Sequence, residues 1–300
     1  MKQYRVGLIR VLTTTDEVLL QSHGALLRQY FPMLDVHSRC LPDQPEGIHD
    51  EATMAVGVPK VVALAREMWE EGFEAIIVSC AGDPGVEQAR RELPIPVIGA
   101  GESTAALSLF YGKTPALLGI TSDVPDGYRR ILDGRIVSNA RGEGVESVLD
   151  LMTPEGYSAT VDRALQQKKL GAEVIALSCT GMSTLQIAPA LEKATGLPVL
   201  DPVLCAGMMT YFELLRREMR KEAVRFVSVQ CDVSTYGMAQ KHLRHSWDVM
   251  PDSIKKYQRQ KNKENKRLEV VEILDRRLFN IASRTVCRGL DSFCHGHNCP

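Results

Sequence analysis

The sequence of 300 residues lacks both a long uninterrupted apolar run and a dominant charge. Its first segment, MKQYRVGLIRVL, is interrupted by Arg5 and Arg10, so it does not have the apolar core of a signal peptide, and no later window is long enough to span a bilayer. Lysine and arginine number 36 against 37 aspartate and glutamate, which gives no argument for a nucleic-acid or membrane partner. We therefore expect a cytoplasmic protein whose partner is a small-molecule substrate.

Cysteine is also sparse. The eight cysteines are spaced too unevenly to form a disulfide framework, and in a reducing compartment they would remain thiols. The hydrophobic fraction of 44% and the charged fraction of 24% are those of an ordinary globular chain, so a buried core is expected. Each cysteine must then be judged by its local context.

Apolar segments alternate with amphipathic ones through the first 220 residues, which is typical of an α/β protein with parallel strands. The first half predicts strands over 4–12, 34–40 and 75–80 and within 93–103, with helices over 18–30, 58–71, 83–91 and 103–111. The second half predicts strands within 115–123, 172–179 and 197–202, with helices over 155–169 and 206–220.

The same order of elements is written twice, with a period of roughly 100 residues. We expect two α/β lobes, the first built from residues 1–112 plus about 206–240 and the second from residues 113–205. Residues 241–300 form a basic extension with thirteen Lys and Arg against seven Asp and Glu, partly helical or disordered, with a short helix over 267–281. Its Cys287, Cys294, His295, His297 and Cys299 are soft ligand types, but their spacing matches no standard zinc finger, so we predict no metal.

Two strand ends carry the strongest functional signal. The stretch AIIVSCAGDPG runs from Ala75 to Gly85, and VIALSCTGM runs from Val174 to Met182, so Cys80 and Cys179 occupy matched places in the repeat. Ligands in open α/β sheets bind at the carboxyl ends of the strands, which is where both thiols are expected. A lone cysteine at a strand end is usually a core residue, but a repeated one favours function.

Two opposed thiols are suited to racemisation. One thiolate removes a proton from carbon beside a carbonyl, and the second thiol returns a proton on the other face, so the pair shares one proton and titrates as a unit. No cofactor is required when the carbanion is delocalised into that carbonyl. We expect the helix starts that follow Cys80 and Cys179 to lower both thiol pKa values, and small neighbouring residues to hold an enolate oxygen or the substrate. These neighbours are Ser79, Ala81, Gly82, Thr180 and Gly181.

The motifs EGIHDEATMAVGV, SCAGDPGVEQARRELPIPVIGAGES, LSCTGMSTL and LPVLDP resemble the hydantoin racemase branch of the aspartate/glutamate racemase superfamily, over residues 4–220. The resemblance implies two pseudo-symmetric lobes, each a parallel four-stranded sheet flanked by helices, with the active site between them. It also implies cofactor-independent racemisation with Cys80 and Cys179 as the acid/base pair.

Other candidates have structural alternatives. Arg10 is placed to bind a substrate carboxylate or to form a surface ion pair, and Thr13 and Thr121 to bind substrate or to cap helices. Asp83 would accept a substrate N–H or cap the helix that follows it. Likewise, Glu102 and Asp201 either reach the cleft or cap the next helix, and the isolated His23, His37 and His49 are interpreted as structural or surface groups.

The leading hypothesis is racemisation of a 5-substituted hydantoin. Two departures bear on the substrate: residues 10–15 read RVLTTT where hydantoin racemases usually have an Asn-Pro-Asn loop, and Cys80 is followed by Ala-Gly where amino acid racemases usually have Asn-Thr. The alternatives are an aspartate/glutamate-type racemase and a non-catalytic protein that binds a small metabolite. A homo-oligomer is compatible with the base rate for such enzymes.

Overall fold

The computed structural model describes residues 2–230, with side chains through residue 221. Two four-stranded sheets, all of whose pairings are parallel, form the core. The first has the order β2-β1-β3-β4 and the second the order β6-β5-β7-β8, so the two halves share one topology and confirm the predicted fold class. The strands of the first sheet are β1 (Tyr4–Arg10), β2 (Leu34–Cys40), β3 (Ala75–Ser79) and β4 (Val97–Gly99). Those of the second are β5 (Pro115–Gly119), β6 (Ser138–Arg141), β7 (Val174–Leu177) and β8 (Val199–Leu200).

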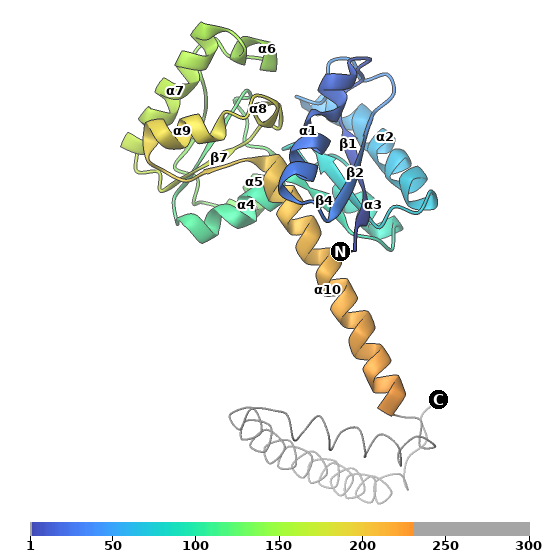
Figure 1. Cartoon of the computed structure of the whole chain (residues 1–300). Coiled ribbons are helices and arrows are strands. Elements are labelled where there is room, and N and C mark those ends of the chain that lie inside the picture. The colour runs from blue at the N-terminus through green and yellow to red at the C-terminus, as the bar shows by residue number, and fades with distance from the viewer. Residues whose placement is uncertain (1, 231–300) are drawn as a thin grey trace, which may run out of the picture. The chain divides into compact units, whose positions relative to one another are not determined.

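Helices flank both sheets, and the two lobes lie side by side (Figure 1). The first lobe contributes α1 (Glu17–Tyr30), α2 (Glu51–Glu70), α3 (Val86–Glu92) and α4 (Ala100–Tyr111). There follow α5 (Asp126–Leu132), α6 (Val148–Leu151), α7 (Pro154–Lys169), α8 (Gly181–Thr184), α9 (Ala188–Thr195) and α10 (Pro202–Gln230).

Local capping explains where the sequence-based boundaries were wrong. Helix α2 begins at Glu51 rather than at residue 58, because the Asp50 side chain accepts from the Thr53 N–H and the Thr53 hydroxyl accepts from the Asp50 N–H.

The sequence analysis did not predict α5, β6, α6 or α9. Strand β6, SNAR, is half-buried along its whole length and has none of the apolar residues by which strands were identified.

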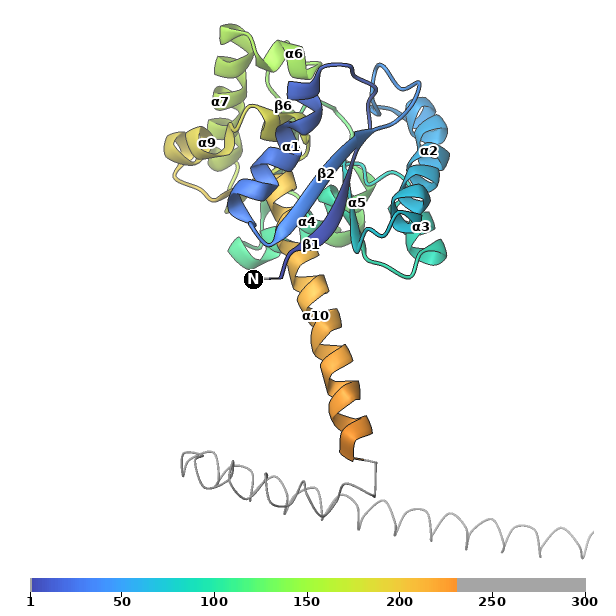
Figure 2. The ribbon, with the colours of Figure 1, turned by 45° about the vertical axis from the view of Figure 1, so that its right-hand side comes forward.

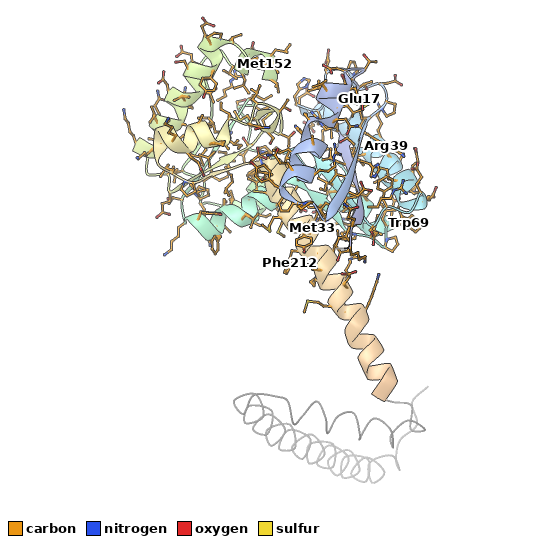
Figure 3. The ribbon with its side chains drawn as sticks, viewed as in Figure 1. Glu17, Met33, Arg39, Trp69, Met152 and Phe212 are labelled. Carbon is orange, nitrogen blue, oxygen red and sulfur yellow. The ribbon has the colours of Figure 1, made fainter. Side chains whose placement is uncertain are left out.

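The lobes exchange helices. The first turns of α10, with Val203 and Ala206, share an apolar cluster with Val6 and Leu8 of the first sheet, and Met33, labelled in Figure 3, packs against it. Helix α4, which follows the first sheet in sequence, instead contacts β7 and shares a cluster with strands of the second (Figure 2 gives the turned view). Each sheet is therefore partly covered by a helix that follows the other sheet in sequence.

By its internal contacts the chain divides into a unit through Glu222 and a second unit from Ala223. The predicted lobe boundaries at residues 112, 205 and 240 stay predictions. The predicted helix over 267–281 and the cluster from Cys287 to Cys299 lie outside the described residues. Within residues 2–230, no helix combines the length and the apolar composition that crossing a bilayer requires.

Candidate active site

The two cysteine turns meet between the lobes. Strand β3 ends at Ser79, directly before Cys80, and β7 ends at Leu177, two residues before Cys179. The Thr180 hydroxyl donates to the backbone carbonyl of Ser79 over 3.2 Å, across 101 positions of sequence. The residue after one cysteine therefore contacts the residue before the other.

Both thiols are shielded from solvent. Cys80 is 8% exposed, and burial raises its pKa to about 12, with smaller contributions from the charges of Asp83 and Cys179. Burial also raises the pKa of Cys179, which is half-buried. The sharing of one proton between Cys80 and Cys179 stays a prediction.

These directions correct the expectation of lowered thiol pKa values. The expected backbone N–H groups are present, from Gly82 and Asp83 at Cys80 and from Gly181 and Met182 at Cys179, and they favour the thiolates. Their effect is outweighed by desolvation, which disfavours the charged form. In addition, α3 begins only at Val86, too far from Cys80 for its N-terminus to act directly.

A buried histidine connects the two turns. His23 of α1 is 1% exposed; its Nδ1 lies 2.8 Å from Ser79 Oγ and its Nε2 lies 2.9 Å from Thr184 Oγ1 at the end of α8. Burial and then the charge of Arg10 lower the pKa of His23 well below its usual value, so the ring is neutral. Of the two interpretations given for His23 from the sequence, a structural or a surface group, its burial supports the structural one, but the contacts with both turns were not foreseen.

Asp83 caps a different helix from the one expected. Its carboxylate accepts from the N–H groups of Gly101 at 2.8 Å and Glu102 at 2.6 Å, which begin α4, whereas α3 is preceded by Gly85 in the left-handed conformation. Asp83 itself has φ of 51°, which turns its side chain toward α4. Burial and the charge of Glu102 raise the pKa of Asp83 to about 7, although both N–H donors oppose that shift.

In the second half of the chain, Asp201 caps α10 as Asp83 caps α4. Its Oδ1 accepts from the N–H groups of Val203 and Leu204, which begin α10, and from the Ser183 hydroxyl at 2.9 Å. Burial raises the pKa of Asp201. Of the alternatives stated for Glu102 and Asp201, the structure supports capping for both, because Glu102 accepts from the Gly99 N–H.

Arg10 is buried, 4% exposed, at the carboxyl end of β1. Its Nη1 donates to the Leu19 carbonyl at 2.6 Å and to the Ser22 hydroxyl at 3.1 Å, so this nitrogen orients the start of α1. Burial lowers its pKa to about 10. The alternative of a surface ion pair is therefore wrong.

The threonine candidates have local partners. The Thr13 hydroxyl donates to the Leu41 carbonyl at 2.6 Å and accepts from the Gln44 N–H, which ties two loops together. The Thr121 hydroxyl donates to the Asp123 carbonyl at 3.3 Å within its own loop. Neither caps a helix, and their roles toward a substrate stay predictions.

The glycines of both turns lie close to neighbouring side chains. A Cβ at Gly82 would lie 2.9 Å from Met54 Cε, and one at Gly181 would lie 2.3 Å from Val148 Cγ2. Ala81 is buried.

A pocket of about 530 Å³ lies beside the first turn. It is lined by Gly82 and Asp83 together with residues of α2, α3 and α5, and neither thiol lines it. Within the described part of the chain, no three His, Cys, Asp or Glu side chains gather as metal ligands would.

Solved structures with this fold include racemases. Allantoin racemase from Klebsiella pneumoniae superimposes with a TM-score of 0.63 at 22% identity, covering 71% of this chain and 88% of its own. Allantoin racemase from Pseudomonas fluorescens superimposes with a TM-score of 0.60 at 24% identity, covering 71% of this chain and 92% of its own. The fold is therefore that of a two-lobed racemase.

Sequence comparison defines the family. The profile of the Asp/Glu/Hydantoin racemase family matches residues 11–210, and the chain belongs to that family. The hydantoin racemase of Pseudomonas sp. (strain NS671) is 29% identical over 178 residues, 54% of this chain and 66% of that protein. The hydantoin racemase of Rhizobium meliloti is 30% identical over 178 residues, 56% of this chain and 71% of that protein. These relatives confirm the predicted enzyme class, a racemase.

Proposed function

We propose that this racemase inverts the stereocentre of a 5-substituted hydantoin without a cofactor, with Cys80 and Cys179 as its two acid/base groups. The observation that carries the proposal is the hydrogen bond from the Thr180 hydroxyl to the Ser79 carbonyl, because it joins the two cysteine turns across the lobes. The names of the curated relatives and the solved allantoin racemases support a cyclic ureide as the substrate class.

In the proposed mechanism one thiolate removes the proton from the ring carbon beside the carbonyl. The electron pair of the broken C–H bond is delocalised into that carbonyl, and the other thiol gives its proton to the opposite face. The thiol that gave its proton becomes the thiolate, so the next turnover runs in the opposite direction. The N–H groups of Gly82 and Gly181 favour the thiolates, and in this mechanism they also stabilise the developing enolate charge.

The raised thiol pKa values follow mainly from the burial of both sulfur atoms. A buried thiolate is costly, and a substrate that brings its own polar ring offsets part of that cost. Arg10 was a candidate to bind the carboxylate of an amino acid substrate. Its Nη1 instead donates to backbone carbonyls and a hydroxyl of α1, which weakens the case for an amino acid substrate.

The test is incubation of one enantiomer of a 5-substituted hydantoin with the full chain in deuterated water. Loss of optical rotation together with deuterium at the ring carbon is expected, and the Cys80→Ser and Cys179→Ser variants should each lose racemisation while keeping the far-ultraviolet circular dichroism of the wild type. Undiminished turnover by either variant would refute the thiol mechanism. Parallel assays with aspartate and glutamate enantiomers, resolved by chiral chromatography, distinguish the substrate classes.

A further inference from the structure

One imidazole touches both cysteine turns. His23 lies on α1 of the first lobe, where its Nδ1 meets the hydroxyl of Ser79, the residue before Cys80. Its Nε2 meets the hydroxyl of Thr184, which ends the short helix that follows Cys179. Ser79 and His23 are both almost fully buried, so their contact is made away from water, whereas the contact with Thr184 is partly buried.

The chemistry of the ring suits this position. A neutral imidazole has one N–H donor and one acceptor nitrogen, and each hydroxyl can take either role, so both contacts are satisfied at once. Burial and the nearby Arg10 guanidinium keep the ring neutral. Around it, the Thr180 hydroxyl holds the Ser79 carbonyl, so Ser79 is bound through its side chain by His23 and through its backbone by the second lobe.

We propose that His23 is a positioning residue that fixes the separation of the Cys80 and Cys179 turns, so that both thiols address one carbon atom. This inference rests on the proposed function. Removing a proton requires one thiol at the correct distance, but inversion requires the second thiol to be in place on the opposite face within the lifetime of the carbanion. Without the histidine bridge, the thiol that took the proton exchanges it with solvent and returns a deuteron to the same face.

The experiment separates exchange from inversion. The full chain is incubated in deuterated water with one hydantoin enantiomer, and chiral chromatography with mass spectrometry measures deuterium in the remaining enantiomer and in the inverted product. For the wild type, deuterium should appear mainly in the inverted product. For His23→Leu, similar in size but without hydrogen bonds, the ratio of deuterated starting enantiomer to inverted product should rise about tenfold.

Two further variants keep the test informative should His23→Leu fold poorly. Thr184→Val removes only the contact in the second lobe and should raise the same ratio, whereas His23→Gln, which retains a donor and an acceptor, should restore most of the wild-type value. The matched control is His37→Gln in β2, whose exposed ring contacts Asp35 and the Phe73 ring and neither cysteine turn, and it should leave the ratio unchanged. An equal fall of exchange and inversion in His23→Leu and Thr184→Val, with the ratio constant, would overturn the proposal.

A readout without substrate distinguishes this inference from the proposed function. Peptide-level mass spectrometry gives the alkylation rates of Cys80, Cys179 and Cys205, the last a buried cysteine of α10 that has no hydrogen bond with His23, Ser79 or Thr184. Loss of the bridge should raise alkylation of Cys80 and Cys179 at least about fivefold, with Cys205 unchanged. If the wild type neither exchanges nor racemises any hydantoin, the proposed function fails, while the alkylation rates still decide the bridge: unchanged rates in His23→Leu refute it.

Discussion

Thr180 Oγ1 donates a hydrogen bond to the Ser79 carbonyl oxygen at 3.2 Å, and this bond joins the end of β3 in the first sheet to the turn that follows β7 in the second. Each residue is a sequence neighbour of one cysteine. The bond therefore constrains the relative positions of the two thiols, and its loss should lower the rate of racemisation.

The Thr180→Val variant should test that constraint. Loss of a partly buried hydrogen bond costs about 1 kcal/mol, so we expect a five- to tenfold fall in kcat for hydantoin racemisation, with the C–H exchange rate less affected. The conservative control, Thr180→Ser, keeps the hydroxyl and should retain most of the activity. Equal activities of the valine, serine and wild-type proteins would show that the bond has no part in catalysis.

The raised thiol pKa values predict the pH dependence of the rate. Because burial raises the pKa of Cys80 to about 12 and that of Cys179 above its usual value, the thiolate fraction of the free enzyme grows tenfold with each pH unit below them. We expect kcat/KM to rise without a plateau between pH 6 and about 8.5. A plateau below pH 7.5 in the measured profile would mean that the thiols ionise more easily than their burial allows.

Asp83 should make stability depend on pH in the unusual direction. Its pKa is raised from 3.8 to about 7, so its favourable contribution is complete below the unfolded value and is lost as the pH rises through about 7. Urea unfolding should show the wild type losing stability relative to Asp83→Asn between pH 4 and pH 7. The control is Glu71→Gln, because Arg39 lowers the pKa of Glu71 and the dependence should have the opposite sign. The same sign for both residues would contradict the assignment.

Gly127 of α5 is a test of how closely the lobes pack around Asp83. A Cβ at Gly127 would lie 2.2 Å from Asp83 Oδ2 and 3.1 Å from the Glu102 nitrogen, so Gly127→Ala should reduce the free energy of unfolding by about 2 kcal/mol. The cost should be smaller when the same change is made in an Asp83→Ala background, which removes the clashing carboxylate. A strictly additive double mutant in urea unfolding would exclude the clash as the cause.

The Tyr128 side chain packs against residues of the second sheet. It is fully buried and its hydroxyl donates to the Leu177 carbonyl at 2.7 Å, directly before the Ser178-Cys179 turn. Tyr128→Phe should leave that carbonyl unsatisfied and cost about 1–2 kcal/mol of unfolding free energy, measured by thermal or urea denaturation. Tyr157→Phe, on an exposed face of α7, should cost close to nothing, and a comparable loss in both variants would argue against the hydrogen bond.

The repeat of the cysteine turns was legible in the sequence because parallel strands are short apolar runs and because the Ser-Cys-[Ala/Thr]-Gly pattern occurs at the end of one such run in each half. The capping of α10 by Asp201 is likewise a local matter, decided within three residues, and it was among the stated alternatives. In contrast, β6 and α6 have only four residues each, too short for a periodic signal, and β6 has no Val, Leu or Ile.

The sequence by itself thus determined the two α/β halves and the position of a thiol at the end of a strand in each, since both depend on neighbours along the chain. Only the tertiary structure decided that His23 bridges the turns, because its partners lie 56 and 161 positions away. It also decided the target of the Asp83 carboxylate and the direction of the thiol pKa shifts. Burial is a property of the packed lobes, and the desolvation it imposes outweighs the local N–H groups that the sequence made visible.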